Sequence, residues 1–115
     1  MSDQLALRQK LQDFADYLFP VVDRFPKSEK FALSTQIKNT VYGLLRLTVR
    51  MHKSRDRLRW LFEIDVELEY LRFLVRHAHS RRFLSSRRLQ VVALKVSEIG
   101  RILGGLIKAQ KGARP

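Results

Sequence analysis

The stretch LFEIDVELEYLRFLVRHA, residues 61–78, decides the fold of this chain. Its apolar side chains recur at alternating steps of three and four residues: Leu61, Ile64, Leu68, Leu71, Val75 and Ala78. Such steps place side chains on one face of an α-helix, whereas a half-buried strand would alternate at every second residue. The stretch therefore predicts an amphipathic helix whose apolar face is buried against other helices.

The same spacing recurs along the rest of the chain. It extends this helix over about residues 56–82 and predicts further helices over about 2–22, 28–52 and 86–110. The breaks between the four segments are short, and no segment alternates with period two. Four helices with tight connections run up, down, up and down. We therefore predict an all-α fold, an antiparallel up-down-up-down four-helix bundle.

Capping residues and prolines mark the expected helix ends. The candidate N-caps are Ser2 or Asp3 for the first helix, Ser54 or Asp56 for the third, and Ser85 for the fourth. Pro20 predicts a kink or an early stop in the first helix. Pro26 predicts the start of the second helix at about Ser28.

The chain has 115 residues, which is the usual size of one domain. We expect the bundle to span residues 1–110 and residues 111–115 to form a flexible basic tail. The chain has no cysteine, which excludes a disulfide framework and a thiolate metal site. Its first residues, Met1–Gln4, do not resemble a secretory signal, and no apolar run has the length of a membrane span. We expect a soluble, cytoplasmic protein.

The charge balance indicates a polyanionic partner. Lys and Arg total 23 against 11 acids, which gives a net charge of +12. The charges are also segregated, because no acid occurs between Glu29 and Asp56 or between Glu69 and Glu98. A solvated basic face is the plain alternative, but such sorting in a small basic chain favours nucleic-acid binding.

Two groups of basic residues are the candidate nucleic-acid contacts. One is a ridge opposite the apolar stripe of the second helix, formed by Arg46, Arg50 and Lys53. The other lies before and after the third connection, and comprises Arg72, Arg76, Arg81, Arg82, Arg87 and Arg88. Guanidinium groups suit phosphates because they form paired, charge-assisted hydrogen bonds. The sequence leaves the choice among RNA, DNA and a hybrid open.

No catalytic constellation is visible in the sequence. His52, His77 and His79 lack the spacing that places two metal ligands on one helical face. Asp65 and Glu69 form a spaced acid pair, for which a surface salt-bridge ladder is the simpler interpretation. We therefore predict a protein that is not an enzyme and that needs no cofactor or metal.

Apolar side chains outside the main stripes indicate a homo-oligomer. Val91 and Leu94 lie nearly opposite the apolar stripe of the fourth helix. Clustered exposed apolar residues usually mark contacts, although a wide core arc would also explain them. Gly104 and Gly105 interrupt the same helix at a cost of roughly 1 kcal/mol each relative to alanine. Close approach of another helix and a local bend are both open explanations for the pair.

Three segments together resemble one known family. They are VDRFPKSEKFAL over residues 22–33, LEYLRFLVR over 68–76 and EIGRILGGLIK over 98–108. They are similar to the accessory variability determinant (Avd) proteins of diversity-generating retroelements. That family lies within a wider four-helix-bundle group that includes the ribosomal-RNA intervening-sequence proteins. Leu106 departs from the pattern, in which tryptophan is favoured after the two glycines.

The resemblance implies a specific assembly and role. Avd-like proteins form barrel-shaped homopentamers that associate with a reverse transcriptase and its template RNA during mutagenic cDNA synthesis. On this basis we expect an interface between copies that includes Val91, Leu94, Arg101, Gly104 and Gly105. The alternative is a scaffold of the intervening-sequence type, which binds an acidic protein or structured RNA outside a retroelement.

Overall fold

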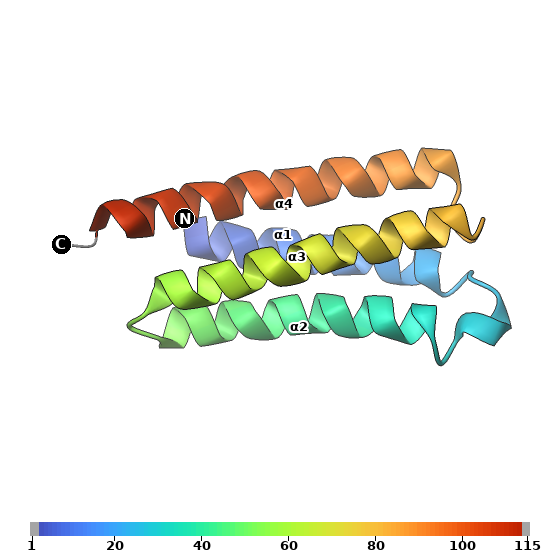
Figure 1. Cartoon of the computed structure of the whole chain (residues 1–115), viewed down its shortest axis with the longest axis horizontal. Helices are drawn as coiled ribbons and strands as arrows, with labels where there is room; N and C mark the ends of the chain where they lie inside the picture. The colour runs from blue at the N-terminus through green and yellow to red at the C-terminus, as the bar shows by residue number, and fades with distance from the viewer. Residues whose placement is uncertain (1–2, 114–115) are drawn as a thin grey trace.

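The computed structural model describes residues 3–113, which form four long helices and no strand. The helices are α1 (Asp3–Val22), α2 (Leu33–Lys53), α3 (Arg57–Ser80) and α4 (Ser86–Ala113), with a short 3-10 turn η1 (Lys27–Glu29) before α2. The predicted all-α four-helix bundle is confirmed at this level (Figure 1). The candidate cap Ser2 lies outside the described residues.

The four helices lie side by side along the long axis of a rod measuring 50 × 24 × 22 Å. Helices α1 and α3 each pack against both α2 and α4, so the four helices surround one central core. In Figure 1 the α1–α2 and α3–α4 connections lie at one end of the rod, and the α2–α3 turn lies at the other. This placement decides which basic residues become neighbours.

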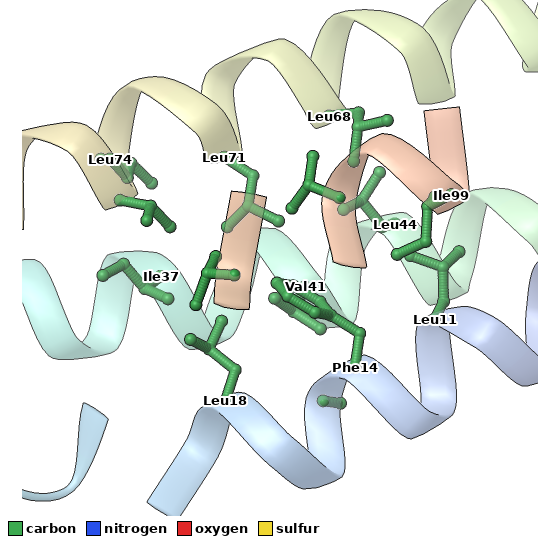
Figure 2. Close-up of a cluster of buried hydrophobic side chains, with 14 of the residues drawn as sticks. Leu11, Phe14, Leu18, Ile37, Val41, Leu44, Leu68, Leu71, Leu74 and Ile99 are labelled. Carbon is green, nitrogen blue, oxygen red and sulfur yellow. The ribbon is translucent and has the colours of Figure 1, made fainter. Parts of the chain in front are cut away.

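The predicted apolar stripes form the core. In α3, Leu61, Ile64, Leu68 and Leu71 are at most 1% exposed. Figure 2 shows Leu68 and Leu71 directed at side chains from the other helices: Leu11, Phe14 and Leu18 of α1, Ile37, Val41 and Leu44 of α2, and Ile99 of α4. In α1 the buried stripe ends on Val22, which follows Leu18 by about one turn on the same face.

Two of the predicted caps are present. The Arg59 N–H donates to Asp56 Oδ1 at 3.4 Å, and the Arg88 N–H donates to Ser85 Oγ at 3.1 Å. The early stop considered at Pro20 is wrong, because α1 continues to Val22. Pro20 lies in the last turn and on the exposed side, where its missing N–H leaves only one carbonyl without a helical partner.

Helix α2 begins at Leu33, five residues after the predicted start at Ser28. Residues 27–29 form the 3-10 turn instead, and Ala32 breaks the helical backbone with φ −121° and ψ −104°. The reason is burial. Leu33 is the first residue of the second segment that reaches the core, whereas Lys30 and Phe31 are exposed and gain nothing from continuing the helix backwards.

The ends of α3 and α4 also differ from the prediction. Helix α3 ends at Ser80 because Arg82 adopts a left-handed conformation with φ 66°, which turns the chain toward α4. Helix α4 continues to Ala113, so three residues of the predicted tail are helical. The last two residues, Arg114 and Pro115, lie outside the described part of the chain, and the flexibility of the tail stays a prediction.

Candidate nucleic-acid interface

The basic ridge predicted on α2 is exposed and lies toward the α2–α3 turn. Arg46, Arg50 and Lys53 are all exposed on that helix. The Arg50 guanidinium lies 5.4 Å from the centroid of the Trp60 ring in α3, and the Arg59 guanidinium lies 4.8 Å from the same ring. A cation–π contact holds a guanidinium in place without using its N–H donors. The guanidinium groups of Arg50 and Arg59 are therefore held beside Trp60 with their N–H donors still able to bind a phosphate.

Further basic residues join this ridge at the turn, and they were not among the predicted site residues. Arg55 lies in the connection, and Arg57 opens α3. We call the whole set the turn cluster: Arg46, Arg50, Lys53, Arg55, Arg57 and Arg59. The end of α4 reaches the same region, because Lys111 Nζ lies 5.4 Å from the ring centroid of Phe62 in α3. The sequence feature that could have identified these residues is the run of basic residues around Ser54, between the predicted second and third helices.

Arg72 and Arg76 are paired with an acid of their own helix. Arg72 Nη1 lies 3.1 Å from Glu69 Oε2, and Arg76 Nη2 lies 3.8 Å from Glu69 Oε1. The Glu69 part of the expected salt-bridge ladder is therefore present. Because Glu69 and Arg76 are largely exposed, these pairs contribute little to stability. Glu69 does offset part of the positive charge, so the two arginines form a weaker phosphate site than they would without that acid.

Gly100 provides room for Arg72. A Cβ atom at Gly100 would lie 2.9 Å from Arg72 Nη2 and 3.9 Å from Leu68 Cδ2. The bare backbone of α4 therefore lets the Arg72 side chain lie across the α3–α4 seam. This role was not predicted, because the sequence around a helical glycine does not show which side chain of another helix will lie against it.

The remaining predicted arginines gather at the α3–α4 connection. We call them the connection cluster: Arg81, Arg82, Arg87 and Arg88. Arg88 is partly buried and its Nη1 donates to the Tyr17 hydroxyl at 3.4 Å, which ties α4 to α1. The other three are exposed, and the α1–α2 connection with Lys27 and Lys30 lies at the same end of the rod (Figure 1).

The two clusters stay apart within one chain. Along α3, the last residue of the turn cluster is Arg59, and the connection cluster begins at Arg81, 22 residues later. At 1.5 Å per residue, about 33 Å of helix separates these two arginines. The acids Glu63, Asp65, Glu67 and Glu69 lie on α3 between them. The structure thus places positive charge at both ends of the rod rather than on one continuous face.

An ion pair between α1 and α4 uses two charges outside these clusters. Lys10 Nζ lies 2.7 Å from Glu98 Oε1. The hydrogen bond and the charge of Lys10 lower the pKa of Glu98, and the corresponding bond to Glu98 raises the pKa of Lys10. Lys38 is similarly bonded to Asp23. Glu98 of α4 and Asp23, which directly follows α1, therefore pair with lysines that belong to neither cluster.

The residues expected at an interface between copies lie on the outer side of α4. Leu94 is 72% exposed, and Arg101, Gly104 and Gly105 are exposed, whereas Val91 is half-buried. A Cβ atom at Gly104 or Gly105 would meet nothing within 4 Å. Packing among the described residues therefore does not explain the glycine pair, and its role at a contact between copies stays a prediction.

A second exposed apolar face runs along α3. It comprises Phe62, Val66, Tyr70 and Phe73. The Tyr70 and Phe73 rings are stacked with their centroids 6.4 Å apart, and the Phe73 and His77 rings are stacked at 6.0 Å. Exposed large apolar side chains grouped on one helix face make it a further candidate for a contact with a protein.

Residues 3–113 contain no group of three or more His, Cys, Asp or Glu side chains arranged to hold a metal ion. His77 is stacked on Phe73, and His79 Nε2 lies 3.0 Å from Ser86 Oγ. Glu69 of the acid pair is shared by Arg72 and Arg76. Over the same residues, no helix combines the length and hydropathy that crossing a bilayer requires.

The sequence matches the model of a known protein family. A family model described as bAvd-like matches residues 5–110, which is nearly the whole chain. No curated protein matches the chain.

Proposed function

The chain belongs to the bAvd-like family, and from this membership we propose that it is a non-catalytic accessory protein of a diversity-generating retroelement. In this proposal it binds the element's reverse transcriptase and its template RNA or cDNA in the cytoplasm. The functional unit is a ring-shaped homopentamer of antiparallel up-down-up-down bundles.

The observation that carries the nucleic-acid part of the proposal is the position of the two cationic clusters. Each occupies one end of the rod, and acids such as Glu67 and Glu69 lie between them. In a ring whose subunits stand side by side, equivalent clusters of neighbouring copies would line up into two cationic rims. Rims of this kind bind by charge and shape and need no base-reading motif.

Salt dependence tests this proposal. Binding of the full chain to an RNA hairpin and to a duplex DNA is measured at 50 and 200 mM salt. A site that neutralises about six phosphates should lose roughly 10³-fold or more in affinity over that range, because bound phosphates release their counterions. Weak binding at low salt, or affinity that hardly changes with salt, contradicts the proposal.

Variants that remove positive charges test the assignment to the clusters. Replacing Arg81, Arg82 and Arg87 with glutamine should weaken binding to many sequences alike and reduce the salt slope. The control replaces Lys10 with glutamine, because Lys10 is already paired with Glu98 and lies outside both clusters. If the control variant loses as much affinity per charge removed as the cluster variant, binding follows net charge and the clusters are not the site.

One observation favours the alternative function, a scaffold for an acidic protein partner. A groove of about 210 Å³ between α3 and α4 has apolar walls that include Val75, Leu89 and Val92, with Arg72 and Arg76 at its edge. Apolar walls with a cationic edge suit an acidic peptide better than a bare phosphate chain. Purified protein free of nucleic acid, with a normal absorbance ratio, favours this alternative.

A further inference from the structure

Phe31 is the most exposed of the large apolar residues in the described chain. It is 89% exposed and lies in the turn that joins η1 to α2. Backbone hydrogen bonds order this turn: the Lys30 N–H donates to Lys27 O at 3.1 Å and the Ala32 N–H donates to Glu29 O at 3.1 Å. A defined turn therefore exposes the phenyl ring to solvent. The stability of the fold does not explain this exposure, because an exposed apolar side chain gains no free energy from burial.

Cations surround this ring. Lys30 Nζ lies 5.6 Å from the centroid of the Phe31 ring. Phe31 also lines a hollow of about 400 Å³ whose wall includes Lys27, Lys30 and Lys38. Lys38 is held by Asp23, while Lys27 is exposed at the end of the rod that carries the connection cluster. An open aromatic ring and ammonium groups thus occur side by side at a cationic end of the molecule.

We propose that Phe31 and its neighbouring lysines form a stacking site for one unpaired base of a single-stranded nucleic acid. The base would stack on the phenyl ring at the mouth of the hollow, and Lys27 and Lys30 would bind the adjoining phosphates. Aromatic rings beside a cationic groove are how proteins bind single strands without reading sequence, because every base has a π-face. The inference rests on the proposed function and adds to it a preference for unpaired strands.

The surroundings of Phe31 favour a base over a protein partner. Its exposed neighbours in the turn and in the hollow are mostly charged or small: Asp23, which is paired with Lys38, and Pro26, Lys27, Lys30 and Ala32. Protein contacts need apolar patches of a few hundred Å². On this chain, exposed apolar side chains are grouped in that way on α3, not around Phe31. One ring flanked by cations matches the size and charge of a nucleotide.

The test compares binding of the full chain to a 15-nucleotide unstructured single strand and to a fully paired hairpin of equal charge. Phe31→Ala should weaken single-strand binding at least about fivefold and leave hairpin binding nearly unchanged, because stacking on one aromatic ring is worth that much or more. Phe31→Tyr should retain single-strand binding, and Phe31→Leu should lose it, because leucine is apolar but has no π-face.

Two further measurements make the test specific. Phe31→Trp should show quenching of its added indole fluorescence by the single strand, beyond that of the wild-type protein with Trp60 alone. Phe62→Ala is the matched control, since Phe62 is also an exposed phenylalanine with a lysine ammonium beside its ring. Its ratio of single-strand to hairpin affinity should equal that of the wild type, because Phe62 lies on the apolar face of α3 and outside the proposed stacking site.

The outcomes separate this inference from the proposed function. Wild-type protein that binds neither probe defeats both. Wild-type binding that Phe31→Ala leaves unchanged defeats the stacking site alone. An equal loss for both probes, or full binding by Phe31→Leu, also overturns it and indicates a simple apolar contact, as with a protein partner.

Discussion

Arg82 is the residue at which local backbone geometry matters most. Its φ of 66° lies in the left-handed region, which disfavours residues that carry a Cβ atom. The conformation persists because it ends α3 with two further bonds: Arg82 N–H to His79 O and Phe83 N–H to Ala78 O, both 2.9 Å. Phe83 then packs near Phe25, with ring centroids 5.9 Å apart. Glycine is the usual residue at such a position.

Replacing Arg82 with glycine should therefore stabilise the protein. We expect the free energy of unfolding to rise by about 1 kcal/mol, because glycine adopts positive φ without a steric penalty. Urea denaturation measures the change. Arg81→Gly is the control, since it removes the same charge at a residue with φ −82° and should give no gain. Equal effects of the two variants would show that charge, not backbone strain, limits stability at this turn.

At the scale of single helices, the glycines of α4 differ in what explains them. Gly100 makes room for Arg72, whereas a Cβ atom at Gly104 would have no neighbour within 4 Å. Gly43 in α2 is equally open. Glycine destabilises a helix interior, and only Gly104 of these two open glycines lies on the predicted contact face of α4, so we expect Gly104 but not Gly43 to serve a contact outside the subunit.

A matched pair of substitutions tests that requirement. Gly43→Ala should raise the free energy of unfolding by about 1 kcal/mol, the usual difference in helix propensity. Gly104→Ala should fail to give this gain and should lower the mass of the assembly, because an added methyl group would separate closely packed copies. Denaturation and light scattering measure the two effects. Equal gains with unchanged mass would remove Gly104 from the predicted interface.

At the scale of the whole molecule, the cationic clusters lie toward the ends of the rod, and exposed apolar side chains lie along its length among charged ones. The clusters lie at the ends, while Leu94 on α4 and the apolar face on α3 lie along its length. Contacts between copies through the sides would leave both ends free for polyanions. Under the proposed function, this division would let one small chain assemble and bind nucleic acid at the same time.

Light scattering tests the assembly. The wild-type protein should have about five times the 13.6 kDa mass of one chain, and Leu94→Glu should reduce that mass by placing a charge in an apolar contact. Gln90→Glu, on the same exposed side of α4, is the control and should leave the mass unchanged. A monomeric wild type would defeat the ring, and an unaltered Leu94→Glu assembly would place the contact elsewhere.

Prediction from the sequence succeeded where the signal was local. The 3-4 spacing from Leu61 to Ala78 located α3 and its buried face, and Asp56 and Ser85 were recognisable as caps. It failed at the start of α2, where Pro26 and Ser28 resemble a helix start but the first buried side chain is Leu33. The sequence did not predict the exposure of Phe31 either, because phenylalanine is ordinarily a core residue.

The amino-acid order by itself determined the number of helices, the face that each one buries and the strong excess of positive charge. These are consequences of a repeat of 3.6 residues per turn and of composition, both of which act within a few residues along the chain. Only the tertiary structure decided that Lys27 and Lys30 share an end with Arg81 and Arg82, and that Arg72 crosses Gly100. Residues so distant in sequence become neighbours through helix packing, which no local pattern encodes.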